Sequence, residues 1–115
     1  MCKLLTEFCV NTIGYKKSKG VPNYRVFKIR DGKTMGRYDP DTHTIKIFYN
    51  NIENLGDFVK TFIHEFTHSN QNLRYYANRL VKFGYILHPD EIEARMSEEE
   101  YKTPALNYLR KNITL

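Results

Sequence analysis

The sequence predicts an α+β fold in a single domain that covers residues 1–115, and three observations support this prediction. The chain is short enough for one domain and long enough to bury one core. Its composition, 41% hydrophobic and 27% charged, is that of a globular protein. Strand-like patterns occupy the middle of the chain, between segments with helical periodicity. We therefore expect an N-terminal helix, a small antiparallel sheet of two or three strands, a long helix and a further helix after it.

The N-terminal half of the chain predicts one helix followed by a meander of strands. Helical periodicity runs from Lys3 to Ile13, and Gly14 is placed to end this helix. The next residues, 15–23, are basic and contain Gly and Pro, which favours a loop. Alternating and β-branched patterns with two turn signals predict strands at 24–29, 34–38 and 44–49, with turns at Asp31-Gly32 and 39–42.

The clearest element is a long helix in the second half of the chain. Apolar residues recur at three- and four-residue steps from Leu55 to Leu80, which predicts one helix of about six or seven turns. Asn54 is placed to cap its N-terminus, and Gly84 is placed to end it. The unbroken apolar stripe indicates that this helix forms the spine of the core.

Another helix is predicted after the long one. Pro89 suits its first turn, because the fixed φ of proline is helical and its missing N–H has no helical partner there. This helix is expected to run to about Lys102, since Pro104 would interrupt it. The tail over residues 105–115 then predicts a short terminal helix or strand.

The long helix carries the pattern His64-Glu65-Phe66-Thr67-His68. Two histidines at this spacing lie on one helix face, about 40° apart, and their rings can share a metal ion at about 2.0–2.1 Å. Glu65 lies beside them, close enough to act on a water held by the ion. The apolar stripe is centred nearly opposite His64, so the histidines would face a cleft. The alternative is a chance pattern on a polar helix face, which average residue frequencies predict in about 0.3% of chains of this length. The pattern therefore indicates a site for one zinc ion.

A zinc site of this kind needs a third protein ligand, which leaves the fourth position to water. The best source is the start of the next helix, because a carboxylate there can return to the long helix in antiparallel packing. Three side chains in that segment are candidates, namely Glu91, Glu93 and His88. Each acid is otherwise explained as an exposed first-turn residue that favours the helix dipole.

Together these residues resemble the gluzincin metallopeptidases. In that family a helix with the pattern Glu-x-x-Ala follows the HExxH helix and supplies the third ligand, and the matching residues here run from Glu91 to Ala94. The resemblance implies that Glu91 binds zinc together with His64 and His68, and that Ala94 allows close helix packing. It covers residues from about 34 to 95 and implies a zincin-like fold.

Two details place the chain within that resemblance. The string from His64 to Gln71 is similar to HExxHxxQ variants found in minimal single-domain gluzincins. Arg95 is a departure, because many gluzincins have at this position an Asp or Asn that orients a zinc-bound histidine. The sequence therefore names no orienting partner for the histidines.

The resemblance implies a zinc metallopeptidase that hydrolyses peptide bonds in a peptide or protein substrate. Glu65 would take a proton from the metal-bound water and pass it to the leaving amine. The strand at 44–49 would form the edge of the cleft and pair with an extended substrate. Four side chains are candidates to stabilise the oxyanion, and the sequence does not choose among Tyr75, Tyr76, Tyr85 and His88.

Two other functions remain open from the sequence. The chain lacks the additional domain that walls the cleft in large peptidases, so one alternative is a non-catalytic metal-binding structural or interaction component of a larger assembly. The other is an SprT-like protease acting on nucleic-acid-bound proteins, a weaker resemblance in which a third histidine, here His88, would be the ligand. Segment 16–37 would then contact nucleic acid, since it carries eight Lys or Arg residues and one acid in a chain of net charge +5. A solvated basic loop and hairpin is the other explanation of this segment.

The sequence also predicts the location of the protein. No signal peptide or transmembrane stretch is apparent, so no membrane partner is expected. Cys2 and Cys9 match no metal or redox motif and are expected to be reduced thiols in the cytoplasm. The small single-domain proteins that this chain resembles are encoded by bacteriophages and bacteria, so a virion component is the alternative. His43 lies in a turn before a strand and is expected to be exposed.

Overall fold

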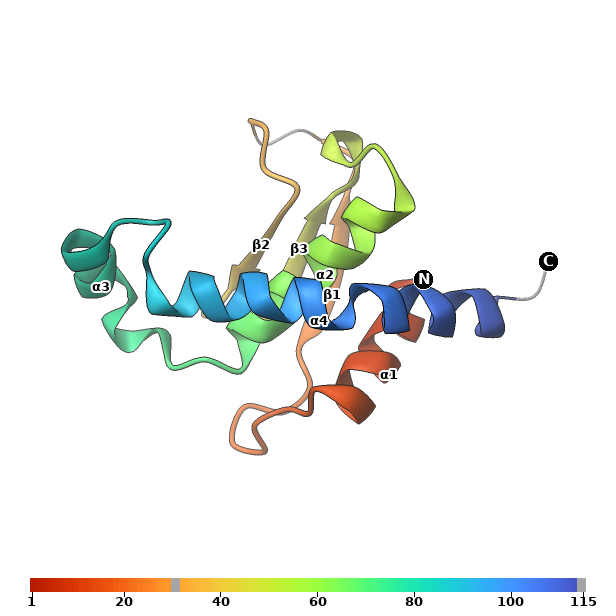
Figure 1. Ribbon diagram of the computed structural model, residues 1–115, viewed down its shortest axis with the longest axis horizontal. Coiled ribbons are helices and arrows are strands. Elements are labelled where there is room, and N and C mark those ends of the chain that lie inside the picture. Colours follow the sequence, from red (N-terminus) through yellow and green to blue (C-terminus); the bar gives the residue numbers. More distant parts are fainter. Residues whose placement is uncertain (30–31, 114–115) are drawn as a thin grey trace.

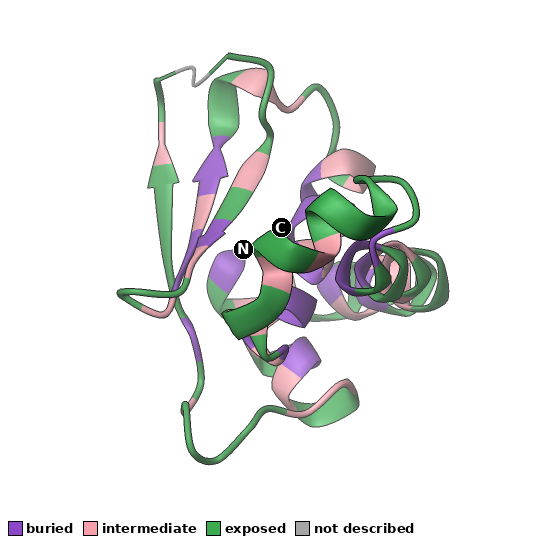
Figure 2. Cartoon of the chain, turned by 90° about the vertical axis from the view of Figure 1, so that its left-hand side faces the viewer, coloured by how far each residue is buried: buried purple, intermediate pink, exposed green. Residues whose placement is uncertain are grey.

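The computed structural model describes residues 1–29 and 32–113 and has the predicted α+β architecture (Figure 1). The elements in chain order are α1 (Cys2–Thr12), β1 (Asn23–Phe27), β2 (Gly36–Asp39), β3 (Thr44–Phe48), the 3-10 turn η1 (Tyr49–Asn51), α2 (Leu55–Ser69), the 3-10 turn η2 (Leu73–Tyr75), α3 (Tyr76–Phe83) and α4 (Pro89–Asn112). The strands form one sheet on one side of the molecule, and α1, α2 and α4 lie on the other side (Figure 2). The core between these layers contains completely buried residues from α1, β3, α2 and α4: Leu5, Cys9, Ile45, Ile47, Val59, Phe62, Ile63, Phe66, Ala105 and Leu109. The predicted turn at Asp31-Gly32 falls partly outside the described residues.

β3 occupies the centre of the sheet, whose strand order is β1-β3-β2. β2 runs antiparallel to β3, but β1 runs parallel to it, with Asn23 opposite Thr44 and Phe27 opposite Phe48. The predicted antiparallel meander is therefore wrong for β1. Burial explains the strand order. β3 is buried at every position except Lys46 and suits the central place, whereas β1 is mostly exposed and suits an edge.

α1 is the predicted N-terminal helix. It buries Leu5, Phe8 and both cysteines, and it ends before Gly14, whose φ of 86° is readily accessible to glycine alone. Both cysteines are free thiols, and burial raises the pKa of Cys9 to about 12. Cys9 is therefore an unreactive core residue.

α2 ends at Ser69, so the prediction of a single helix reaching Leu80 is wrong. The reason lies in the polar run over residues 69–72, where Ser69, Asn70 and Asn72 are poor helix formers whose side chains can compete for nearby backbone groups. The side-chain amide of Asn70 makes a tertiary contact at this point, donating to the Gly14 carbonyl at 2.8 Å. The end of α2 is thus fixed against the loop that follows α1.

The sequence correctly places a helix start at Asn54 and a helix end at Gly84, although two separate helices, α2 and α3, lie between these residues. Asn54 Oδ1 accepts a hydrogen bond from the Asp57 N–H at 2.8 Å and caps α2. The later part of the pattern forms η2 and α3, and Gly84, with a φ of 72°, ends α3. The change of direction after α2 carries α3 to one end of the molecule (Figure 1), and none of its residues, all of which are described, is buried.

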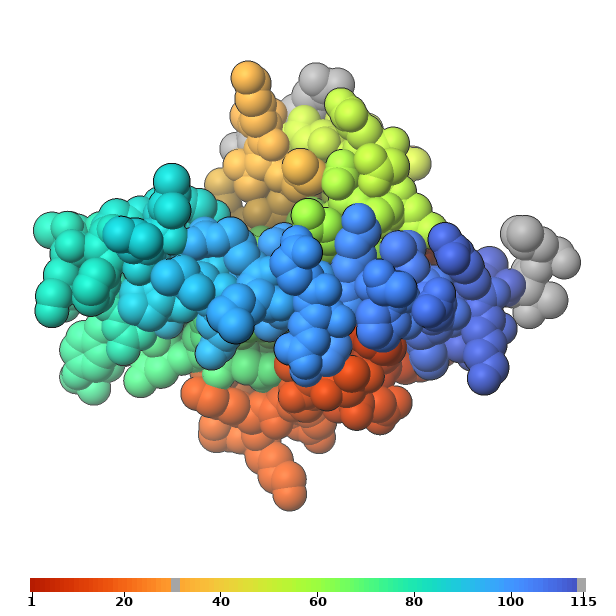
Figure 3. All heavy atoms as spheres, viewed as in Figure 1, coloured from red at the N-terminus to blue at the C-terminus, as the bar shows by residue number. Residues whose placement is uncertain are grey.

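α4 continues through Pro104 to Asn112, so the predicted interruption is wrong. A proline inside a helix costs about 3 kcal/mol or more. Ala105 and Leu109 lie just beyond it and are completely buried, and this burial offsets the cost. Figure 3 shows α4 lying across the front of the molecule. No helix in the described part of the chain, α4 included, combines the length and the apolar character needed to cross a membrane.

His43 is half-buried, which corrects the expectation of an exposed residue. Its Nε2–H donates to the Gly20 carbonyl at 2.8 Å, so its Nδ1 accepts from the Tyr38 hydroxyl, at 2.6 Å. These two bonds join the loop before β1 to β2. His43 therefore has a structural role.

Among the described basic residues of segment 16–37, Arg37 lies in β2 and Arg25 lies in β1. Lys16 and Lys19 precede β1, and Lys28 and Lys33 follow it. Lys19 Nζ donates to the Gln71 carbonyl at 2.7 Å, just after α2, where the helix dipole favours a cation. Nucleic-acid binding by this segment stays a prediction.

Candidate metal centre

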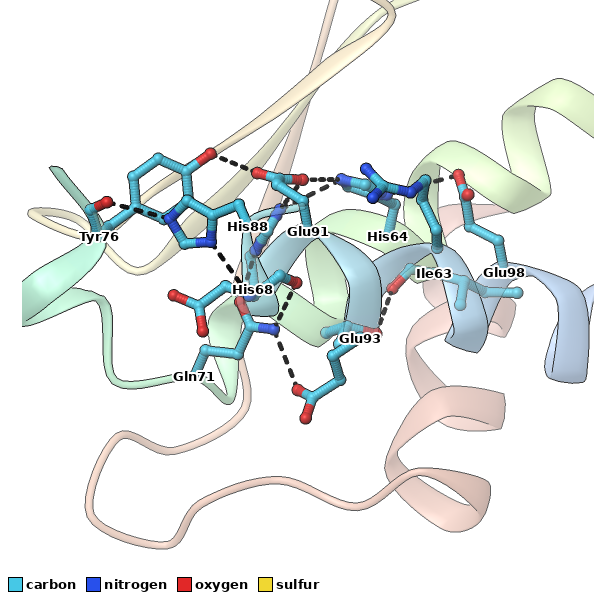
Figure 4. Close-up of polar contacts among 12 residues, drawn as sticks. Ile63, His64, His68, Gln71, Tyr76, His88, Glu91, Glu93 and Glu98 are labelled. Atoms are coloured by element: carbon cyan, nitrogen blue, oxygen red, sulfur yellow. Dashed lines mark hydrogen bonds and ion pairs between the residues drawn. The ribbon is translucent and has the colours of Figure 1, made fainter. Parts of the chain in front are cut away.

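α2 and α4 bring three electron-pair donors to one point (Figure 4). His64 and His68 lie one turn apart on α2, with their Nε2 atoms 3.1 Å from each other. The first turn of α4 carries Glu91, whose Oε1 lies 3.0 Å from His64 Nε2 and 3.1 Å from His68 Nε2. These are the three residues that the sequence predicts to hold a metal. Their ligand atoms all lie within 4.8 Å of one another.

The hydrogen bonds on the far side of each ring show which nitrogen is available to a cation. His68 Nδ1 lies 2.6 Å from Gln71 Oε1, and His64 Nδ1 lies 3.5 Å from Glu98 Oε1. Both partners are acceptors, so each Nδ1 carries a proton, and in the neutral rings both Nε2 lone pairs face Glu91 Oε1. Ligands at 2.0–2.1 Å from a tetrahedral zinc are about 3.3 Å apart, within a few tenths of an ångström of the observed separations. The donor set therefore fits zinc.

The electrostatics of the cluster favour positive charge. Burial disfavours the protonated form of His64, but hydrogen bonds to Glu91 and Glu98 outweigh burial and raise the pKa of His64 to about 10. Burial likewise disfavours the Glu91 carboxylate, but hydrogen bonds from His64, His68 and Tyr76 hold its pKa well below the usual value. A proton and a metal ion would therefore compete for the same electron pairs.

Glu65 lies beside the cluster but outside it. Its carboxyl is buried, and burial raises its pKa despite the neighbouring histidines and a hydrogen bond from the Tyr38 backbone N–H. β2 approaches α2 closely here, because a Cβ on Gly36 would lie 2.5 Å from Thr61 Cγ2. The carboxyl is therefore held between the helix and the sheet, where it can exchange a proton without joining the donor set.

The structure places the two other candidate ligands away from the donors. Glu93 accepts a hydrogen bond from Gln71 Nε2 at 3.0 Å. His88 is completely buried at the start of α4, where its Nδ1 accepts from the Asp90 N–H at 3.1 Å and caps the helix. The structure thus brings Glu91 to the histidines, and it brings neither Glu93 nor His88.

Three polar partners of the cluster are not predicted in this role. From the sequence, Gln71 is named only as part of the HExxHxxQ string and Tyr76 only as a candidate to stabilise the oxyanion, and Glu98 is not named. Spacing could have indicated two of them. Gln71 follows His68 by three residues, and Glu98 follows Glu91 by seven, which is two turns along the same helix face. Tyr76 carries no such signal, because the break after α2 determines its position. Arg95, at the position where many gluzincins have Asp or Asn, donates to the Ile86 carbonyl.

The donors line one side of a cleft of about 420 Å³. The rest of the lining includes Gly36 and Arg37 of β2, and Leu73, Tyr76 and Tyr85 from the segment after α2. The strand bordering the cleft is therefore β2, which corrects the prediction that residues 44–49 form its edge. Residues 44–48 form β3, which has a strand on either side and cannot offer its backbone to a ligand.

Replacing Gln71 with Ala is expected to weaken metal binding about 10–100-fold, because His68 would lose the acceptor that fixes its ring and tautomer. Competition with a chromophoric chelator measures the change. Asn72→Ala is the matched control, since this neighbouring amide is exposed and bonds the Arg74 N–H. Equal affinities for Gln71→Ala and the wild type would show that Gln71 does not orient His68.

Comparison of this chain with protein-family models, with curated proteins and with solved structures found no match.

Proposed function

We propose that this protein is a zinc-dependent peptidase, with the ion held by His64, His68 and Glu91 and with Glu65 as the general base. The observation that carries the proposal is the convergence of two imidazole lone pairs and one carboxylate oxygen on one point. Such a set of electron pairs in a buried place is unfavourable unless a proton or a metal ion lies between them. The carboxyl of Glu65 lies next to this point but is not one of the converging ligands.

Each side chain has a definite part in this proposal. Zinc, when bound, lowers the pKa of a water and polarises a carbonyl group. Glu65 accepts a proton from the attacking water and returns it to the leaving amine, and its raised pKa brings proton affinity closer to neutral pH. β2 is an edge strand of the sheet and lines the cleft, so an extended peptide can pair with it as an additional strand.

The ligand assignment is tested by elemental analysis of purified wild type, Glu91→Ala and Glu93→Ala. We expect about one zinc per chain in the wild type and in Glu93→Ala, and a loss of most of the metal in Glu91→Ala. Glu93 is a matched control, because it is an acid in the same helical turn whose carboxylate bonds Gln71 instead of the histidines. Metal retained in Glu91→Ala, or absent from the wild type, would contradict the proposal.

The peptidase activity needs a separate measurement. The wild type is incubated with a mixture of peptides of varied sequence, and products are identified by mass spectrometry. Cleavage should stop when a chelator removes the metal and resume when zinc is restored. Stoichiometric zinc without cleavage of any peptide would instead support a non-catalytic metal-binding component.

A further inference from the structure

The two oxygens of Glu91 have different surroundings. Oε1 faces His64 and His68, and Oε2 accepts a hydrogen bond from the Tyr76 hydroxyl (Figure 4). Tyr76 is the first residue of α3, which follows a change of chain direction, so it reaches the cluster from outside both helices that carry the donors. The carboxylate is therefore held from two sides.

Tyr76 is itself held firmly. Its ring packs on the ring of His88 with centroids 4.1 Å apart and an interplanar angle of 31°. His88 Nε2–H donates to the Tyr76 carbonyl at 3.0 Å, and His88 Nδ1 caps α4. The completely buried His88 thus connects Tyr76 to the helix turn that carries Glu91. His88 therefore fixes the Tyr76 hydroxyl relative to the Glu91 carboxylate. Residues that position a metal ligand are usually held in this way by packing and hydrogen bonds.

A glutamate can bind a metal ion through one oxygen or through both. We infer that Tyr76 is a positioning residue whose hydroxyl occupies Glu91 Oε2 and restricts the carboxylate to one-oxygen binding through Oε1. The inference rests on the proposed metal site. With two imidazoles, a one-oxygen carboxylate fills three positions of a tetrahedron and leaves one for the reaction. A two-oxygen carboxylate would crowd that position.

Cobalt(II) is the probe for this inference, because it occupies zinc sites and its visible d–d absorption weakens as the coordination number rises from four to five. In Tyr76→Phe, which keeps the ring against His88, Oε2 loses its hydrogen bond and is expected to bind the metal. The molar absorbance per bound Co²⁺ should fall about twofold or more relative to the wild type. Tyr75→Phe is the matched control, since it removes a hydroxyl from the exposed neighbouring residue and should leave the spectrum unchanged.

The outcomes separate this inference from the proposed function. If the wild type binds no stoichiometric Co²⁺ or Zn²⁺, the metal site itself is wrong. If the wild type and Tyr76→Phe bind Co²⁺ with the same spectrum, the metal site stands and the positioning role of Tyr76 is overturned. An unchanged spectrum with a lowered kcat would show that the hydroxyl acts on the substrate instead.

A measurement on the unmodified protein covers the case in which Tyr76→Phe does not fold. X-ray absorption at the zinc edge of the loaded wild type reports the number of light-atom ligands and distinguishes one-oxygen from two-oxygen carboxylate binding. Four ligands with a one-oxygen carboxylate are expected. A two-oxygen carboxylate in the wild type would overturn the inference.

Discussion

Glu65→Gln should lower the rate of peptide hydrolysis by about 10²–10⁴-fold, the usual contribution of a positioned general base, and should leave the zinc content unchanged. The amide is nearly the same size as the carboxyl and cannot accept the proton from water. Since Glu65 is not among the converging donors, its loss leaves all three ligands in place. Initial rates on a cleaved peptide, together with elemental analysis of the same preparation, measure both quantities.

Glu100→Gln is the control for Glu65→Gln, because it makes the same chemical change at an exposed position of α4. It should have wild-type activity and metal content. Activity retained in Glu65→Gln would exclude Glu65 as the base, and loss of metal in this variant would show that Glu65 supports the site structurally.

Phe62→Ala should lower the free energy of unfolding by about 3–5 kcal/mol, which is a large part of the roughly 5–15 kcal/mol that stabilises a typical domain. Phe62 is completely buried on α2, in the core cluster that includes residues of β3, α1 and α4. The deletion leaves a cavity where the helices and sheet meet. Urea unfolding of metal-free protein is the appropriate measurement, because bound metal would add its own stabilisation.

Val81→Ala is the control for Phe62→Ala. Val81 lies on α3 with 90% of its surface exposed, so its truncation should change the free energy of unfolding by less than about 0.5 kcal/mol. Similar losses in both variants would mean that α3 is buried in solution and that the core is not organised around α2. A small loss in Phe62→Ala would mean that the surrounding side chains collapse into the cavity.

The structure shows which residues contact the two histidines although Arg95 stands where many gluzincins have Asp or Asn. A residue four positions after Glu91 lies one turn along α4, where Arg95 bonds the Ile86 carbonyl before the helix. Glu98 lies a further turn along and brings its carboxylate to His64 Nδ1. Gln71 serves His68 in the same way from the end of α2. The polar partners of the two rings therefore lie at other positions than the resemblance to gluzincins implies.

The sequence by itself determined the features that depend on local geometry. The four-residue spacing of His64 and His68 puts both rings on one face of any α-helix, and the position of Glu65 beside them follows from the same geometry. Helix starts at Asn54 and Pro89 were readable because capping involves neighbouring residues. Such features need no knowledge of the rest of the chain.

The tertiary structure decided the features that depend on residues far apart in sequence. β3 takes the central place in the sheet because burial on both faces outweighs the tendency of consecutive strands to pair. The end of α2 at Ser69 is held by the bond from Asn70 to the distant Gly14, and the change of direction that follows brings Gln71 and Tyr76 to the cluster. The packing of α4 on α2 places Glu91, and not Glu93, beside the histidines. This packing cannot be predicted from the spacing of residues that are close in sequence.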